Sequence, residues 1–113
     1  MAVTIDVWAQ DQVDSQDLLD GVFQLHKANK KSLGFLPDAA FRDRAKAGAL
    51  IVARRGKAVV GYTIYDRPRS HLKLVHVCVD GSERKSGIAS MLIDRMVADN
   101  PNATGYEAHC RRD

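Results

Sequence analysis

The sequence lacks several features that would place the chain in a specialised class of protein. Two cysteines are too few for a disulfide framework, and we interpret Cys78 and Cys110 as small buried residues of strand-like segments. No CxxC or HExxH spacing occurs and the four histidines are scattered, so we expect no metal site. No apolar run is long enough to span a membrane, and the N-terminal MAVTIDVWAQDQ lacks a basic segment followed by an apolar one. We therefore expect a cytoplasmic protein without a membrane partner.

The sequence also has no large excess of positive or negative residues. Seventeen Lys and Arg against 14 Asp and Glu give a net charge of +3. This value allows a phosphate-bearing ligand but argues against a nucleic acid as partner. An apolar fraction of 45% and a charged fraction of 27% are typical of folded domains, and 113 residues suffice for one of them. We expect a single domain over residues 1–113.

Hydrophobic periodicity and turn residues divide the chain into eight expected elements. In order, these are a strand over Thr4–Ala9, a helix for which Asp14-Ser15-Gln16-Asp17 supplies an N-cap and an acidic first turn, a helix between Pro37 and Gly48, strands over Ala49–Ala53, Ala58–Tyr65 and Leu72–Val79, a helix over Gly87–Asp99 and a last strand over 104–110. Gly56 allows a tight hairpin between the second and third strands. The order predicts an α/β (α+β) fold: a mixed, mainly antiparallel sheet of about five strands with three helices. The last strand should lie parallel to the fourth.

The turn before the third helix has the composition of an anion-binding site. It reads Arg84-Lys85-Ser86-Gly87-Ile88-Ala89, directly before an apolar helical stripe. A helix start presents unpaired N–H groups and the positive end of the helix dipole, and Gly87 lets a phosphate approach the backbone. Neither GxxxxGK[ST] nor GxGxxG is present, so the nucleoside-triphosphate loop and the dinucleotide-binding unit do not fit.

The pattern Arg84-x-x-Gly87-x-Ala89, after a strand ending at Val79, resembles the acetyl-coenzyme A pyrophosphate loop of the GNAT N-acetyltransferase superfamily, Gln/Arg-x-x-Gly-x-Gly/Ala. The hairpin LIVARRGKAVVGYTIY and the stretch LGFLPDAAFRDRAKAG also resemble the family, so the similarity covers nearly the whole chain. It implies a GNAT-like acyl-CoA N-acyltransferase fold with acetyl-CoA as co-substrate. The implied reaction is transfer of the acetyl group to a primary amine of a small molecule or peptide by direct attack.

The chain departs from the family pattern in two places. Gly81 stands where members often have proline, and Lys85 where they often have glycine. The sequence also ends at Asp113, whereas family members usually continue with a segment that carries a tyrosine for protonating the leaving thiolate. The alternative is therefore a truncated, non-catalytic module that binds acetyl-CoA or a protein. The exposed last strand, Gly105–Cys110, would then allow a homodimer or pairing with a partner. Acetylation of charged transfer RNA is a third, weaker alternative.

The resemblance also implies which residues hold the co-substrate. In the family the fourth strand separates from the fifth, so that the pantetheine amides pair with backbone of the fourth. The expected cofactor-binding residues are Val77, Cys78 and Val79 on the strand and Arg84, Lys85, Ser86, Gly87, Ile88 and Ala89 in the turn.

Three residues are candidates for the base that deprotonates the amine. His109 comes first, because it lies near the position of a base glutamate in the ribosomal-protein N-terminal acetyltransferases that the chain resembles, and histidine titrates near neutrality. His76 comes second; strand alternation would turn it away from Val75 and Val77. Glu107, on the same face as His109, comes third. For either histidine the alternative is a purely structural role.

Overall fold

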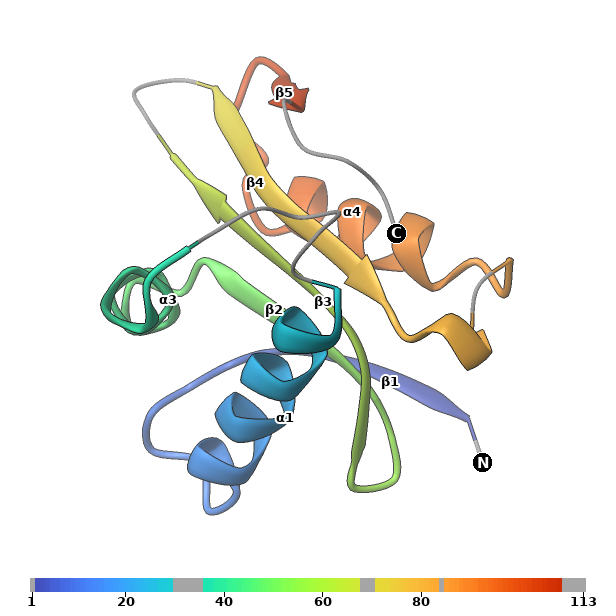
Figure 1. Cartoon of the computed structure of the whole chain (residues 1–113). Coiled ribbons are helices and arrows are strands. Elements are labelled where there is room, and N and C mark those ends of the chain that lie inside the picture. Colours follow the sequence, from blue (N-terminus) through green and yellow to red (C-terminus); the bar gives the residue numbers. More distant parts are fainter. Residues whose placement is uncertain (1, 30–35, 68–70, 84, 109–113) are drawn as a thin grey trace.

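The computed structural model describes residues 2–29, 36–67, 71–83 and 85–108. The elements within them follow the expected order of strand, two helices, three strands, helix and strand (Figure 1). Along the chain they are β1 (Val3–Val7), α1 (Ser15–Ala28), α3 (Asp38–Lys46), β2 (Leu50–Arg55), β3 (Ala58–Asp66), β4 (Leu72–Val79), the 3₁₀ turn η1 (Gly81–Glu83), α4 (Ile88–Ala98) and β5 (Tyr106–Ala108).

The strands form one sheet in the order β1-β2-β3-β4-β5. The first four pair antiparallel with their neighbours, and β5 runs parallel to β4 after the crossover through α4. β5 is short: its pairing extends only from Leu72↔Tyr106 to Leu74↔Ala108. The mixed, mainly antiparallel sheet is therefore confirmed, and the described residues form three α-helices as expected. Within the same residues, the expected count of about five strands becomes four longer strands and one short one.

The hairpin predicted around Gly56 is confirmed. Gly56 has a φ of +63°, which the tight turn requires, and the β2–β3 pairing runs from Arg55↔Ala58 to Leu50↔Ile64. β2 extends to Arg55 instead of Ala53, because the turn takes up fewer residues than the sequence suggested, and β3 extends by one residue to Asp66. This hairpin forms the centre of the sheet. At the end of β2, Arg55 lies close enough to the η1 turn to bind Glu83.

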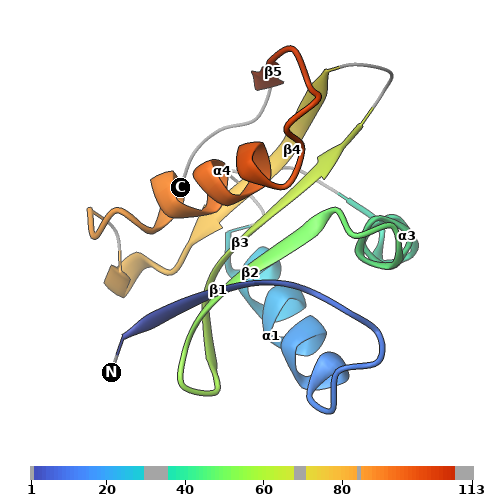
Figure 2. The same cartoon turned by 180° about the vertical axis from the view of Figure 1, so that it is seen from behind.

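Helices cover both faces of the sheet. α1 and α3 lie on one face (Figure 1), and α4 lies on the other (Figure 2). The cluster under α1 and α3 includes Trp8, Leu19, Val22, Phe41, Tyr62 and Cys78, and the cluster under α4 includes Ile51, Leu74, Val77, Ile88, Leu92 and Met96. Two buried layers thus fix the helices on the sheet. Among the described residues no helix has the length and apolarity that crossing a bilayer requires.

Glycines let two of these helices approach the sheet closely. A Cβ on Gly21 of α1 would lie 2.6 Å from Val59 Cγ2. On the other face, a Cβ on Gly61 of β3 would lie 3.0 Å from the carbonyl oxygen of Cys78 and 3.1 Å from Ile88 Cγ2. The first turn of α4 therefore packs directly against the backbone of the central strands, which sets the position of the helix start.

The start of α1 corrects one expectation. Asp14 occupies the N-cap position, but its side chain makes no capping hydrogen bond to the helix. Its carboxylate instead accepts a hydrogen bond from Arg54 of β2, with 2.5 Å between Nη1 and Oδ2. The Arg54 Nε also lies 3.4 Å from an Asp6 carboxylate oxygen. Pairing with a cation from a distant strand thus replaces the local cap that the sequence suggested.

Candidate functional site

The sheet is open beside the C-terminal half of β4. β5 pairs with Leu72–Leu74 only, so in the described part of the chain no strand lies next to Val77 and Val79 on that side. Their opposite neighbour, β3, stays paired with β4 up to Gly61↔Val79. In the described residues the parallel pairing therefore ends well before the end of β4 that leads into α4, and an extended ligand can bind along the strand edge there.

A bulge in β4 turns backbone groups toward this opening. Leu72 N–H donates to the Gly105 carbonyl on the β5 side (3.0 Å), whereas Asp80 N–H donates to the Val60 carbonyl on the β3 side (2.8 Å). A regular strand would direct both groups to the same side, because the two residues are an even number of positions apart. The register shift at Val75 reverses the alternation.

After the bulge, odd-numbered residues of β4 direct their N–H and C=O groups to the open side. Val77 and Val79 thus offer unpaired backbone donors and acceptors there, while their side chains pack under α4. Cys78 lies opposite Tyr62 of β3, and the alternation directs its backbone to that strand. Its side chain is buried on the α1 face. Of the three strand residues expected to hold the pantetheine, Val77 and Val79 direct their backbone groups to the open side, and Cys78 directs its own to β3.

The turn that follows β4 is closed by local hydrogen bonds. The Asp80 carboxylate accepts from the N–H and the hydroxyl of Ser82, both at 3.0 Å, and the Asp80 carbonyl accepts from Glu83 N–H at 2.8 Å. The Ser86 hydroxyl donates to the Glu83 carbonyl. Lys85 has a φ of +66°, a left-handed conformation that costs free energy in a residue with a Cβ.

The start of α4 presents a set of N–H groups to the same region. Gly87 is the N-cap, with a φ of +87°, and no side chain of the described residues caps the helix. The first intrahelical bond runs from Met91 N–H to the Gly87 carbonyl at 3.0 Å, so the N–H groups of Ile88, Ala89 and Ser90 have no acceptor within the helix. A Cβ on Gly87 would meet nothing within 4 Å. This backbone cradle fits a diphosphate, which needs close approach, several donors and the positive helix end.

Charged side chains around the turn are partly paired. Arg55 at the end of β2 donates to both carboxylate oxygens of Glu83, at 3.0 and 2.9 Å. These hydrogen bonds, together with the charge of Glu83, raise the pKa of the Arg55 guanidinium, which therefore stays protonated at every working pH. Lys85 is exposed. Arg84, expected at the rim of the site, lies outside the described residues.

His76 lies at the bulge and faces α1. Its ring stacks on that of His26, with centroids 5.2 Å apart and planes at 22°, and lies 6.1 Å from the ring of Phe41. The side chain is 4% exposed. The expectation that His76 faces away from both neighbours is right for Val77 but wrong for Val75. Val75 packs in the same cluster as Phe41, because the bulge places two successive side chains on one face.

The other two candidate bases do not lie at this bulge in the described structure. Glu107 lies on β5 opposite Lys73, within the stretch where β4 and β5 pair. His109, like Cys110, lies outside the described residues. His76 is thus the candidate that lies on β4 beyond the described pairing with β5.

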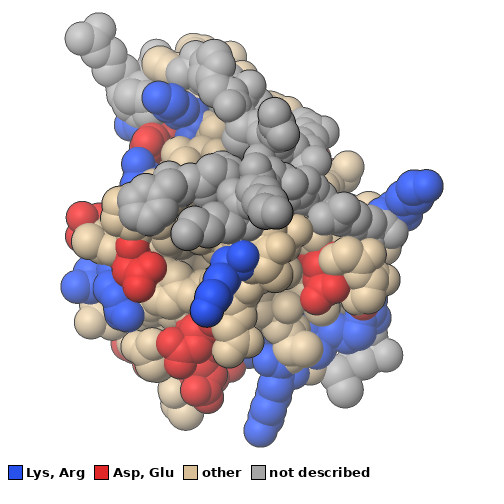
Figure 3. All heavy atoms as spheres, in the orientation of Figure 1, with Lys and Arg blue, Asp and Glu red and all other residues tan. Residues whose placement is uncertain are grey.

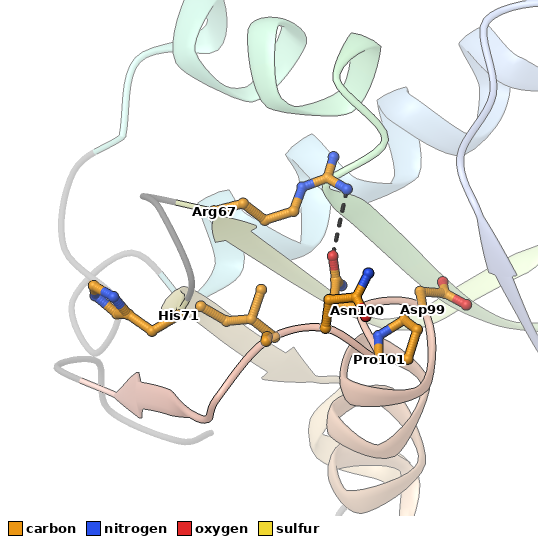
Figure 4. A pocket seen from close by; sticks show the side chains of 8 residues that line it. Arg67, His71, Asp99, Asn100 and Pro101 are labelled. Carbon is orange, nitrogen blue, oxygen red and sulfur yellow. Dashed lines mark hydrogen bonds between the residues drawn. The ribbon is translucent and has the colours of Figure 1, made fainter.

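Several hollows of the described structure lie outside the opening beside β4, and two of them have polar linings of note. One of about 570 Å³ lies between α1 and the β2–β3 hairpin and is lined by Asp17, Asp20, Lys57 and Asp80, among others. The other, of about 240 Å³, lies at the opposite end of β4, where Arg67 donates to Asn100 (3.4 Å; Figure 4). On the face that Figure 3 shows, acidic and basic side chains alternate. The described residues contain no group of three His, Cys, Asp or Glu that could hold a metal ion.

Sequence reasoning did not identify the pair of Arg55 and Glu83 or the contact of His26 with His76. Arg55 and Glu83 are 28 positions apart, and His26 comes from a helix that the pattern assigned to the core. Neither contact has a local sequence signal, because each depends on how distant elements pack.

Comparison with known proteins gives a family and a set of similar folds. Residues 16–112 match the model described as the acetyltransferase (GNAT) family. A search of curated protein sequences gave no significant match. Among solved structures, the diaminobutyrate acetyltransferase of Paenibacillus lautus, in complex with its substrate L-2,4-diaminobutyric acid and coenzyme A, has a TM-score of 0.76 at 17% identity, over 95% of this chain and 64% of that one.

Two further structures are similar. A ribosomal-protein-alanine N-acetyltransferase of Brucella melitensis biovar Abortus 2308 has a TM-score of 0.68 at 20% identity, over 97% of this chain and 81% of that one. The N-acetylglutamate synthase of Neisseria gonorrhoeae, complexed with coenzyme A and N-acetyl-glutamate, has a TM-score of 0.71 at 9% identity. The chain covers 96% of its own length in that match but spans only 25% of the synthase. At these identities the likeness shows a shared fold.

Proposed function

The chain belongs to the GNAT acetyltransferase family, whose model covers residues 16–112, and we propose that it transfers an acetyl group from acetyl-CoA to a primary amine. The observation that carries this proposal is the junction of β4 with α4. There an open strand edge and a helix start without a side-chain cap lie one after the other in the chain. The backbone groups of this junction can bind both parts of acetyl-CoA: the pantetheine arm along β4 and the diphosphate at the start of α4.

The diphosphate would bind at the start of α4. The N–H groups of Ile88 and Ala89 would donate to its oxygens, Gly87 leaves room for close approach, and Lys85 adds a positive charge. The pantetheine arm would extend along β4, where its amides can pair with the backbone of Val77 and Val79 in the manner of an added strand. Each assignment uses backbone groups that have no partner within their own element.

The reaction needs a neutral amine, a donor for the carbonyl oxygen and a proton for the departing thiolate. We assign the first task to His76, whose imidazole takes the proton that the amine nitrogen loses as it bonds to the carbonyl carbon. The second task falls to a backbone N–H of the open β4 edge, at Val77. As the carbon–sulfur bond breaks, the thiolate takes a proton from solvent or from a residue outside the described part of the chain. His109 and Glu107 stay alternative bases.

A non-catalytic, acetyl-CoA-binding module is the second candidate function. The observation that favours it is the burial of His76, which is 4% exposed beneath His26 and Phe41. An acceptor amine would have to reach that ring for catalysis. Binding of acetyl-CoA without turnover would be the expected behaviour of such a module.

Two measurements separate these functions. Isothermal titration of the protein with coenzyme A should show saturable binding; no binding at millimolar ligand would contradict both functions. Release of free thiol from acetyl-CoA is then followed with a panel of amines, including diamines, amino acids and peptides with free N-termini. Amine-dependent thiol release supports the transferase, whereas binding without release supports the module.

A further inference from the structure

Two residues from distant segments meet at the turn that leads into α4. Arg55 ends β2, and Glu83 ends the η1 turn. The guanidinium binds the carboxylate through two bonds, Nε to Oε1 at 3.0 Å and Nη2 to Oε2 at 2.9 Å. The Glu83 side chain is 19% exposed and that of Arg55 36%. A two-bond pairing with a planar guanidinium fixes both the distance and the orientation of the carboxylate.

This pair ties the turn to the sheet. The other side-chain hydrogen bonds described for the turn are local: Asp80 holds Ser82, and Ser86 holds the Glu83 carbonyl. They define the shape of the turn but do not attach it to the hairpin. The Arg55–Glu83 pair makes that attachment across 28 positions of sequence.

The turn has a physical reason to need an attachment. Lys85 and Gly87 both have left-handed backbone angles, with φ of +66° and +87°. A residue with a Cβ keeps such a conformation only where its surroundings hold it there. Lys85 lies between Glu83, which the sheet holds through Arg55, and the start of α4, which the buried Ile88 holds. Without the first of these anchors, the stretch up to Gly87 could relax to more favourable angles and its N–H groups would lose their common direction.

We propose that Arg55 is a positioning residue for the diphosphate of acetyl-CoA, acting through Glu83 rather than by contact with the phosphates. The inference rests on the proposed function, because it concerns the same site. It predicts a change in coenzyme A affinity opposite to the one expected from charge alone. Removal of an acidic side chain beside an anion site should strengthen anion binding if charge alone mattered. Removal of Glu83 should weaken binding, because it releases the turn as fully as removal of Arg55 does.

The test is a double-mutant cycle in which the dissociation constant of coenzyme A is measured by isothermal titration. Arg55→Ala and Glu83→Ala should each weaken binding by about tenfold, and the double variant should be no weaker than either single variant, since all three lose the same pair. Circular dichroism and thermal unfolding establish that each variant is folded at the titration temperature.

Two matched controls separate position from net charge. Arg54→Ala removes the neighbouring cation of the same strand, whose partners are Asp14 and Asp6, away from the turn. Asp94→Ala removes an exposed carboxylate from α4 itself. Each control changes the net charge by the same amount as its test variant. Both should bind coenzyme A within about threefold of the wild type, a change of the size that a distant screened charge produces.

A second readout distinguishes positioning from general structural damage. S-acetylpantetheine carries the thioester and the amides but no diphosphate. With it as donor, Arg55→Ala should leave KM and kcat unchanged, whereas KM for acetyl-CoA should rise by about tenfold at unchanged kcat. An equal loss with both donors would mean that the substitution disturbs the whole site and would overturn the proposal.

The remaining outcomes are equally decisive. Coenzyme A affinity of Arg55→Ala equal to that of Arg54→Ala, or tighter binding by Glu83→Ala, would overturn the inference and leave the proposed function intact. Additive losses in the double variant would also overturn it, because they would show that Arg55 acts on the phosphates by itself. Failure of the wild-type protein to bind coenzyme A would instead contradict the proposed function.

Discussion

Replacement of Gly87 by alanine tests the cradle at the start of α4 most directly. The backbone there has a φ of +87°, where an L-residue costs about 1 to 2 kcal/mol relative to glycine. No atom lies within 4 Å of the added Cβ, so the protein alone suffers no steric cost beyond this strain. In a domain of this size the strain lowers Tm by about 5 °C. The protein should therefore still fold.

The cost to ligand binding should be larger than the cost to stability. The new methyl group occupies the space through which a phosphate reaches the N–H groups of the first helical turn. Loss of one or two charge-assisted hydrogen bonds, each worth about 1.5 to 3 kcal/mol, should weaken coenzyme A binding by at least about tenfold. Isothermal titration below the melting transition measures this change separately from stability.

Gly81→Ala is the matched control for this experiment. Among the described residues a Cβ at Gly81 also meets nothing within 4 Å, but its backbone is not left-handed and it begins the η1 turn rather than the helix. Its stability should stay the same or rise by up to about 1 kcal/mol, and its affinity for coenzyme A should not change. If Gly87→Ala bound coenzyme A like the wild type, or if Gly81→Ala lost as much affinity, the placement of the diphosphate would be refuted.

Three further substitutions test other parts of the structure. Lys85→Gly relieves a left-handed φ of +66° and should raise stability by about 0.5 to 1 kcal/mol; a lower Tm would contradict the strain. Gly21→Ala should lower the free energy of unfolding in urea by about 1 to 2 kcal/mol, because the added Cβ would lie 2.6 Å from Val59 Cγ2, although alanine favours helices. A second substitution in the same chain, Val59→Ala, should recover most of this loss. If the protein is a transferase with His76 as base, His76→Gln should lower kcat by about a hundredfold at unchanged KM for acetyl-CoA. The control His71→Gln, just before the start of β4, should be active. Equal kcat values for the two variants would exclude His76 as the base.

The sequence predicted those parts of the fold that depend on local backbone chemistry. Gly56 and Gly48 have the positive φ that their places at a hairpin and a helix end require. In the apolar stripe after Gly87, Ile88, Leu92 and Met96 form the buried face of α4 as expected, whereas Met91 is exposed. Each of these signals lies within a few residues of the feature it predicts, so no knowledge of packing was needed.

The features that shape the site depend on distant contacts and could not be predicted in the same way. No residue type marks the bulge at Val75, which only the register against β3 reveals. Asp14 has the right chemistry for a helix cap, yet Arg54, brought beside it by the sheet, takes its carboxylate. In each case tertiary packing outweighs a local preference.

The extra residue at Val75 means that the number of residues in β4 matters more than which apolar residues they are. A deletion of one position there would restore unbroken alternation along the whole strand. Every later residue up to Val79 would then turn to the opposite side. The backbone N–H groups of Val77 and Val79 would point to β3, and their side chains would leave the layer beneath α4. Conservative exchanges among Val, Ile and Leu should be tolerated at these places, whereas a single codon lost from this strand would dismantle the opening while leaving the turn motif that follows it untouched.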